Sequence, residues 1–353
     1  MQAVLAGFKE RIRAARVAGL PLELRGGGSK RFLGRAAQGE ILDTRDYSGV
    51  ISYEPTELVI TARAGTPLAE IQALLARKRQ MLAFEPPAFG LATVGGTVAA
   101  GLSGPRRPQA GALRDHLLGV KLLDGRGDEL RFGGQVMKNV AGYDVSRLMA
   151  GAMGTLGLLL EVSLKVLPMP AEQRTLRFSM SQSEALVALN RWAGQALPIT
   201  ASCWSGGVLH LRLEGARAAV QAARARLGGE ELGEAAAISF WRDVVEQHHG
   251  FFAGVRRLWR ISVPSTAAPM CADQPSLIEW GGALRWLRDP PPETDLFAEA
   301  ARLGGSARLF RRTPEDEVFD PPLTPSVAQI QERLKRAFDP DGIFNRGRLC
   351  AAW

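Results

Sequence analysis

Two glycine-rich segments in the first half of the chain constrain its fold most strongly. The first spans residues 25–30 and follows a short predicted strand at residues 22–24; the second spans residues 92–104. Glycine lets the backbone adopt positive φ and approach a ligand closely, so several N–H groups can converge on phosphate oxygens. Each segment alone would also suit an ordinary turn, but the pair predicts a phosphate site built from loops.

Neither segment carries a standard nucleotide motif. The chain contains no G-x-x-x-x-G-K-[ST] sequence, which argues against a P-loop, and no G-x-G-x-x-G after a strand, which argues against a Rossmann dinucleotide site. We therefore expect a different class of nucleotide-binding fold.

Composition favours a globular protein with two cores. The chain has 353 residues, of which 46% are hydrophobic and 23% charged, and this length exceeds what one core usually fills. The net charge of +8 comes from scattered cations rather than a basic stripe. This argues against nucleic-acid binding and favours attraction of small anions or an acidic partner.

Cysteine usage and hydropathy indicate a reducing compartment. The three cysteines, Cys203, Cys271 and Cys350, show no C-x-x-C spacing, so we expect no disulfide framework, iron–sulfur cluster or zinc site. Residues 1–19 carry too many charges for a signal peptide, and the apolar run at 148–160 is too short to span a bilayer. We expect a cytoplasmic protein, at most peripheral to the inner membrane through a partner.

Periodicity predicts the elements of the first half. An amphipathic helix ends at Gly19, a strand covers 58–62, and Thr66 is the expected N-cap of a helix that starts at Pro67. Residues 84–111 lack both helical and strand periods and are expected to form a long functional loop. A hairpin follows at 117–132, then a short helix capped by Asp144, and a strand at 158–166 that alternates apolar and polar residues.

The second half alternates strands and helices after a break at residues 167–170. Helices are expected at 183–193 and 216–227, and strands at 208–213 and 258–263. A final helix begins at Thr324-Pro325, with an expected inward face of Val327, Ile330, Leu334 and Phe338. The pattern predicts an α+β protein with domains at 1–168 and 169–353.

Several ordered segments carry a family resemblance. They are residues 25–30, 92–101, 114–120, 138–144 and 154–157, continued by 258–264, 279–287 and 338–345. Their order and spacing resemble the FAD domain shared by vanillyl-alcohol oxidases and p-cresol methylhydroxylase (PCMH), and within it the smaller FAD-binding subunit of bacterial glycolate oxidases. The resemblance implies a PCMH-type FAD-binding domain at 1–168. It also implies a smaller FAD-linked oxidase C-terminal domain with a ferredoxin-like sheet at 169–353, whose final helix returns to the first domain.

The resemblance also implies which residues hold FAD. The first glycine segment and residues 93–96 clasp the pyrophosphate, residues 101–104 and 111 run beside the isoalloxazine and ribityl chain, and residues 157–158 lie against the adenine. The implied FAD-binding set is Arg25, Gly26, Gly27, Gly28, Ser29, Lys30, Thr93, Val94, Gly95, Gly96, Thr97, Gly101, Ser103, Gly104, Gly111, Gly157 and Leu158. Lys138, Asn139 and Asp144 are equally explained by the capped entry of a helix and receive no individual role.

Histidine placement indicates non-covalent FAD and leaves catalysis unassigned. Covalent members of the superfamily attach the flavin to His or Cys near these loops, and this chain has neither there. His116 heads an apolar strand and is expected in the core. Related dehydrogenases bind a metal through second-domain histidines, but His210, His248 and His249 lack ligand spacing, so no metal is expected. His248 or His249 remain candidates for a base.

The resemblance implies an FAD-binding subunit of a glycolate oxidase complex that oxidises glycolate to glyoxylate. Electrons would leave through an iron–sulfur partner to a quinone, beside a larger flavoprotein subunit, because this chain lacks cluster-binding cysteine spacing. Two alternatives stay open: a self-sufficient FAD-dependent D-lactate dehydrogenase, and a non-catalytic subunit with a vestigial flavin site.

Overall fold

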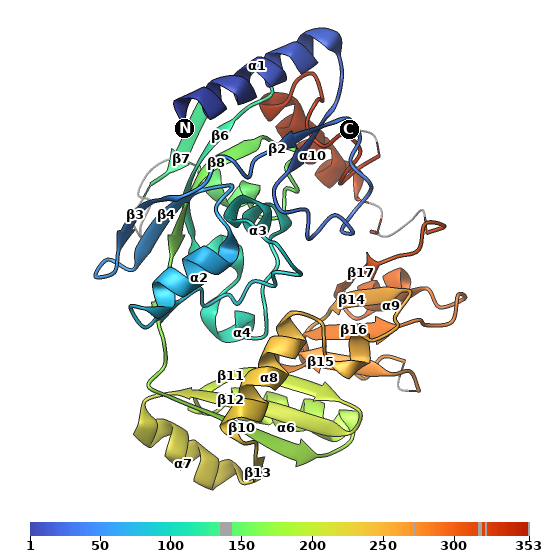
Figure 1. The fold of residues 1–353 in the computed structure, drawn as a ribbon. Coiled ribbons are helices and arrows are strands. Elements are labelled where there is room, and N and C mark those ends of the chain that lie inside the picture. The colour runs from blue at the N-terminus through green and yellow to red at the C-terminus, as the bar shows by residue number, and fades with distance from the viewer. Residues whose placement is uncertain (135–142, 272, 317–319, 322, 352–353) are drawn as a thin grey trace. The chain divides into compact units, whose positions relative to one another are not determined.

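The computed structural model describes residues 1–134, 143–271, 273–316, 320–321 and 323–351. The chain divides into two compact units (Figure 1). Unit 1 comprises Met1–Ser103, Gly111–Met169 and Leu323–Trp353, and unit 2 comprises Gly104–Ala110 and Pro170–Pro322. No helix among the described residues is long and apolar enough to cross a membrane. The mixture of helices and antiparallel strands confirms the predicted α+β class.

Unit 1 is built on a five-stranded antiparallel sheet. Its strands run in the order β3 (Val50–Glu54), β4 (Val59–Arg63), β8 (Leu158–Lys165), β6 (Leu117–Leu123) and β7 (Glu129–Gly133). The predicted hairpin at 117–132 is confirmed, since β6 and β7 pair from Gly119–Gly133 to Leu123–Glu129. Two further short strands, β5 (Gln80–Met81) and β9 (Leu167–Pro168), pair with each other.

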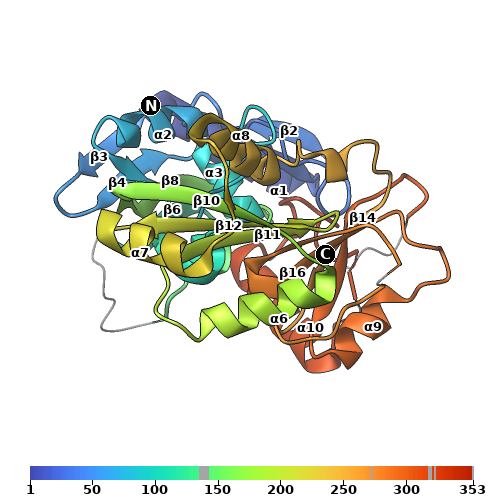
Figure 2. The ribbon, with the colours of Figure 1, turned by 90° about the horizontal axis from the view of Figure 1, so that it is seen from below.

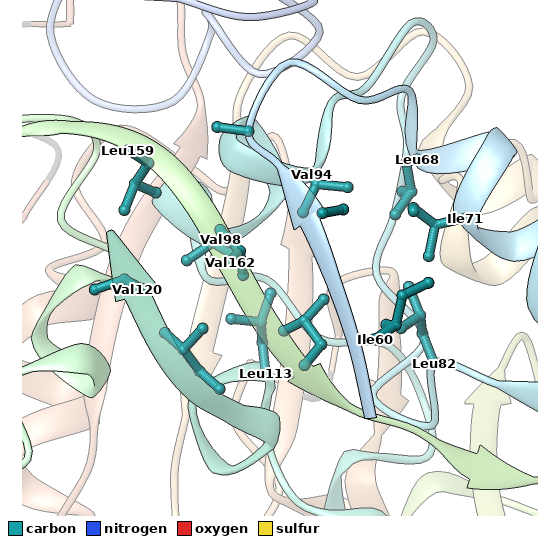
Figure 3. Packing of buried hydrophobic residues seen from close by; sticks show 14 of the residues in the cluster. Ile60, Leu68, Ile71, Leu82, Val94, Val98, Leu113, Val120, Leu159 and Val162 are labelled. Carbon is teal, nitrogen blue, oxygen red and sulfur yellow. The ribbon is translucent and has the colours of Figure 1, made fainter. Parts of the chain in front are cut away.

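Strand β8 is buried on both faces, although its alternating sequence predicted one buried face. Leu159 and Val162 face the main core, which packs beneath α2 (Leu68–Ala76) and α3 (Val94–Ala100) (Figure 3). Leu158 and Leu160 pack on the other side with Phe8 and Ile12 of α1 (Gln2–Ala18). The polar residues between them are short or half-buried, so β8 can serve two cores at once.

Helix boundaries differ from the sequence expectation at two caps. Helix α2 has Pro67 as its N-cap, and the Thr66 hydroxyl instead accepts a hydrogen bond from the Gly49 amide at 2.9 Å. Asp144 precedes a 3₁₀ turn at Ser146–Met149, where its carboxylate accepts hydrogen bonds from the Ser146 hydroxyl at 2.7 Å and the Arg147 amide at 3.4 Å. The unit also contains the short helix α5 (Leu113–His116).

The C-terminal helix α10 (Pro325–Phe338) is held by a buried lysine rather than by the predicted apolar stripe. Val327 and Ile330, both expected inside, are 41% and 58% exposed. Lys335 is 2% exposed and donates hydrogen bonds to Asp339 at 2.6 Å, Thr155 O at 2.8 Å and Phe344 O at 3.0 Å. The prediction was wrong for Val327 and Ile330, because hydropathy cannot foresee three buried acceptors for one ammonium group, whereas Phe338 does pack against the main core.

Unit 2 contains an eight-stranded antiparallel sheet. The order is β13 (Glu230–Glu231), β10 (Glu172–Ser179), β12 (Val208–Gly215), β11 (Ile199–Ser205), β15 (Ser276–Glu279), β16 (Leu284–Arg288), β14 (Leu258–Ser262) and β17 (Ser306–Arg311). Helices α6 (Gln182–Ala193) and α7 (Arg217–Leu227) lie on one face and α8 (Glu234–Val245) on the other (Figure 2). Helix α9 (Leu296–Arg302) and 3₁₀ turns at Gly250–Phe252 and Trp280–Gly282 complete it.

The short segment Gly104–Ala110, which ends in α4 (Arg107–Ala110), groups with unit 2 through buried polar contacts. Arg106 forms a two-pronged ion pair with Glu214, at 2.7 and 2.8 Å, and both side chains are buried. The Trp280 indole donates to Gly104 O at 3.0 Å. A bidentate arginine–carboxylate pair fixes orientation as well as position, so it holds this segment in one place within unit 2.

Replacing Lys335 by Met should destabilise the protein by about 3–5 kcal/mol, because it leaves the Asp339 carboxylate buried without its cation. Arg336→Met is the control, since Arg336 forms only an exposed pair with Glu332 and should cost less than about 1 kcal/mol. Urea unfolding of both variants measures the difference. Equal losses of unfolding free energy in the two variants would show that Lys335 does not hold α10 in place.

Candidate flavin site

The first glycine segment leaves β1 (Leu22–Arg25), which pairs in parallel with β2 (Glu40–Asp43), and turns against the second segment. A Cβ built on Gly27 would lie 1.4 Å from Leu91 O, and one on Gly26 would lie 2.3 Å from the Thr93 hydroxyl. Gly28 has φ +71°, a left-handed conformation that side chains disfavour. Glycine is required here because two backbones touch.

The first segment presents four consecutive backbone N–H groups to the cleft. The N–H groups of Gly26, Gly27, Gly28 and Ser29 donate to no acceptor among the described residues. All four residues are half-buried and line one cleft. Half-buried amides without partners are costly unless a ligand or water accepts from them, so the segment offers an anion four consecutive donors.

The second segment is helical, which corrects the expectation of a long loop at residues 84–111. Thr93 caps α3 by accepting from the Gly96 amide at 3.2 Å, and Gly101, with φ +65°, ends it. Gly95 lets α3 sit directly on β4, because a Cβ there would lie 2.6 Å from the Ala64 Cβ. The amides of Val94 and Gly95 donate to Thr66 O and Ala64 O, so unlike the first segment they are already paired.

The structure brings most of the predicted residues to two adjoining hollows of unit 1. The cleft is lined by Arg25, Gly26, Gly27, Gly28, Ser29, Lys30, Thr93 and Gly96. A neighbouring hollow shares Arg25, Gly26 and Gly96 and adds Gly95, Gly157 and Leu158. Because the two hollows share lining residues, we refer to them together as the groove.

Six predicted residues line neither hollow: Val94, Thr97, Gly101, Ser103, Gly104 and Gly111. Val94 belongs to the main core. The Ser103 hydroxyl accepts from the Leu113 amide at 2.9 Å, and Gly104 belongs to unit 2. The Thr97 hydroxyl is buried and has no hydrogen-bond partner among the described residues. Lys138 and Asn139 lie outside the described residues.

The C-terminal tail supplies two groove residues that the list of candidates missed. Asn345 accepts from the Leu24 amide at 2.8 Å and donates to Met153 O at 2.6 Å, with φ +41°. Arg348 is buried and donates to Lys30 O and Arg31 O, both at 3.2 Å. The resemblance at residues 338–345 was the only sequence signal for this wall, because no local pattern links positions more than three hundred residues apart.

Positive charge surrounds the first segment. Glu23 pairs with Arg25 at 2.5 Å and with Arg31 at 3.2 Å. Burial works to raise the pKa of Glu23, but the hydrogen bond from Arg25 and the charges of Arg25, Arg31 and Arg348 together lower it. One carboxylate thus orders several cations beside the free amides. Lys30 is turned toward the protein and donates to Ala88 O at 3.0 Å.

The histidines lie away from this groove. His116 is buried, with Nδ1 3.3 Å from Lys165 O and its ring against Phe84, as expected of a core residue. In unit 2 His210 stacks on Phe240, whose ring also contacts His249, and His248 is exposed. Burial lowers the pKa of His210 to about 4 and also lowers that of His249. Both imidazoles are therefore neutral near pH 7. Among the described residues, no group of three or more His, Cys, Asp or Glu side chains is placed to hold a metal ion.

The chain is similar to known FAD-binding proteins. The FAD binding domain family model matches residues 6–133. The chain is 48% identical to the Escherichia coli glycolate oxidase subunit GlcE over 94% of this chain and 93% of that protein. The chain belongs to this family of FAD-binding glycolate oxidase subunits. FAD is its cofactor, and the family is one of flavin-dependent oxidoreductases, as the sequence predicted.

More distant relatives share less of the chain. The glycolate oxidase subunit GlcD of Bacillus subtilis is 28% identical over 44% of this chain and 34% of its own length. The D-lactate dehydrogenase of Anaerostipes hadrus is 31% identical over 37% of this chain and 28% of its own length. The solved structure of alkyldihydroxyacetonephosphate synthase matches with a TM-score of 0.66 at 13% identity, covering 96% of this chain and 74% of its own, and so shows a shared fold.

Gly27→Ala should weaken FAD affinity about tenfold or more, because the new Cβ must push the first segment off Leu91 and misalign its amides. The flavin-to-protein absorbance ratio of the purified chain measures this. Gly7→Ala is the matched control, since a Cβ there meets nothing within 4 Å and the site is helical. Full flavin occupancy in Gly27→Ala would contradict the role of this segment.

Stability should fall as pH drops from about 6.5 toward 4, in part through His210. The unfolded imidazole binds a proton near its ordinary pKa of 6.5 but the folded one only near 4, so acid favours unfolding across this window. His210→Phe, which keeps the stack on Phe240, should flatten the loss. Urea unfolding at pH 7 and pH 5 compares the two proteins, and parallel curves would exclude His210 as a contributor.

Proposed function

We propose that unit 1 holds FAD non-covalently, with the diphosphate against the free amides of Gly26, Gly27, Gly28 and Ser29. These donors line one cleft and have no acceptor in the part of the chain that the structure describes, which is the observation that carries the proposal. Arg25 and Arg31, which both form ion pairs with Glu23, would offset the negative charge of the diphosphate. The hollow lined by Gly157 and Leu158 is the proposed site of the adenine.

The remaining predicted residues take supporting roles in this proposal. Gly95 and Gly96 form the part of α3 that lines the groove, and the absence of side chains there keeps the groove open. Gly101, Ser103 and Gly111 follow along the chain beyond that wall and are proposed to flank the ribityl chain and the isoalloxazine. Gly104 belongs to unit 2 and has no role in this proposal. Asn345 holds the segment from Leu24 and the loop of Met153 together across the groove.

As a subunit of a glycolate oxidase, the chain is proposed to take part in converting glycolate to glyoxylate. The substrate loses two electrons and two protons in this reaction, and bound FAD supplies the two-electron acceptor. Electrons would then pass to an iron–sulfur subunit and a quinone, with a larger flavoprotein subunit in the same complex. The free cysteines, of which Cys203 is buried with a raised thiol pKa, support placing clusters in a partner.

The names of the relatives support a complex. GlcE and GlcD are both called subunits of glycolate oxidase, and this chain is similar to each of them. We place the complex in the cytoplasm, where the quinone would draw it to the inner membrane through its partners. A self-sufficient D-lactate dehydrogenase is less well supported, because that relative aligns with only 37% of the chain.

Adding glycolate to the purified, flavin-loaded complex without air should bleach the flavin absorbance near 450 nm, as two-electron reduction requires. Repeating the titration with this chain alone separates the models. Bleaching of the complex only supports the subunit role, whereas fast turnover of the isolated chain with a dye acceptor would favour an autonomous dehydrogenase. A colourless protein that FAD does not stabilise would mean a vestigial site.

A further inference from the structure

The C-terminal tail lies alongside β1, the strand that leads into the first glycine segment. The Leu22 amide donates to Ile343 O at 2.7 Å, and the Asn345 amide donates to Leu22 O at 2.9 Å. These bonds form a parallel bridge between Leu22 and Phe344. Ile343 and Phe344 are fully buried in the same apolar cluster as Leu22. The last residues of the chain are therefore fixed to the strand from which the segment starts.

The tail also binds the first segment at both of its ends. Before the segment, the Leu24 amide donates to Asn345 Oδ1 at 2.8 Å. After the segment, one guanidinium nitrogen of Arg348 donates to Lys30 O and Arg31 O, both at 3.2 Å. Asn345 and Arg348 belong to one turn of the tail, because the Arg348 amide donates to Asn345 O at 3.0 Å. A single turn thus holds the chain on either side of the four amides.

The carbonyl groups that Arg348 binds belong to two overlapping turns. The Arg31 amide donates to Gly28 O and the Leu33 amide donates to Lys30 O, each at 3.2 Å. Lys30 O therefore accepts from Leu33 and from Arg348. Arg348 stabilises both turns at the point where they overlap, directly after the residues whose amides face the cleft.

Both the side chain and the main chain of Arg348 contact the loop that follows the segment. Arg348 is 6% exposed, and its carbonyl accepts from the Arg35 amide at 3.1 Å. Gly34 has φ +69°, and a Cβ there would lie 2.8 Å from the same oxygen. Burying a guanidinium costs free energy that an apolar side chain would not, so we expect a buried arginine where its donors fix one backbone geometry.

Three consecutive glycines need such external support to form a binding site. Glycine has the largest conformational freedom of all residues, so the segment Gly26–Gly28 would otherwise populate many conformations. Ordering them at the moment of binding would lower the affinity for a ligand. Anchors at both ends reduce this cost, because the segment is already ordered when the ligand arrives.

We propose that Arg348 is a positioning residue for the flavin, which holds the end of the first glycine segment so that the amides of Gly26–Ser29 face the cleft before FAD binds. The proposal rests on the function proposed above, in which these amides bind the diphosphate. Arg348 acts through Lys30 O and Arg31 O and needs no contact with the cofactor.

Titration of the full-length apoprotein with FAD tests the proposal. Arg348→Met keeps the apolar stem and removes the donors, so FAD should bind about 10- to 100-fold more weakly, the usual loss for hydrogen bonds from a charged group. Arg346→Met is the matched control. Arg346 is a half-buried arginine of the same tail, but it donates to Gly342 O at 2.9 Å and lines neither part of the groove. This control should bind FAD as the wild type does.

Trypsin digestion of the apoprotein reports on the segment without FAD. Trypsin cleaves after lysine and arginine, and Arg348 binds the carbonyl oxygens of the two peptide bonds that follow Lys30 and Arg31. Arg348→Met should be cut at these two bonds severalfold faster than the wild type, and Arg346→Met should not. Mass spectrometry of the fragments identifies the cleaved bonds. Faster cleavage throughout the chain would indicate general loosening of the fold and would overturn a positioning role.

Arg348→Lys provides a second variant if Arg348→Met does not fold. It keeps the charge and a donor but loses the planar guanidinium, so its FAD affinity and its cleavage rate should lie between those of the wild type and Arg348→Met. FAD affinity equal to that of the wild type in every Arg348 variant that folds would overturn the proposal, even if cleavage after Lys30 and Arg31 became faster.

The wild type distinguishes this proposal from the function on which it rests. If the wild type binds no FAD, the proposed flavin site fails and the role of Arg348 fails with it. If the wild type binds FAD and the Arg348 variants bind it equally well, the flavin site stands and only the positioning role fails.

Discussion

The direct contact between two backbones, Gly26-Gly27 against Leu91 to Thr93, is the constraint on which unit 1 depends. Any side chain at Gly27 would overlap Leu91 O, so the two segments can meet only without Cβ atoms. This contact leaves the amides of the first segment facing a cleft and lets Thr93 cap α3 at its edge. Four consecutive N–H donors thus arise from the way the loops pack, and in the proposed site few side chains would contact the cofactor.

Buried charges secure the parts of each unit that hydrophobic packing leaves loose. Lys335 and Asp339 tie the last helix of unit 1 to Thr155 O and Phe344 O, and so place Asn345 and Arg348 beside the groove. In unit 2, Arg106 and Glu214 seat the segment Gly104–Ala110. Such pairs add little net stability compared with apolar residues, but they permit one geometry only, and a binding site needs a single geometry.

The sequence predicted elements whose apolar residues face one core, and it failed where other forces decide the structure. Helix α1 and the β6–β7 hairpin follow their periodicity closely. Helix α3 was missed because its glycines and alanines carry no apolar stripe; its position depends on the Thr93 cap and on contact with Ala64. The predicted inward face of α10 was wrong for Val327 and Ile330, which are exposed, because the buried Lys335 sets the orientation of the helix. The two glycine segments could be recognised, whereas the wall supplied by Asn345 and Arg348 required the tertiary fold.

A dinucleotide and a small 2-hydroxy acid pose different recognition problems. A dinucleotide is large and offers many oxygens, so backbone amides suffice, and the surrounding sequence can vary widely while the fold persists at 13% identity. A two-carbon acid offers only a carboxylate and a hydroxyl, and its recognition must come from a few fixed side chains. Under the proposed function, changes of such side chains would alter substrate preference while the backbone amides that line the cleft stay in place.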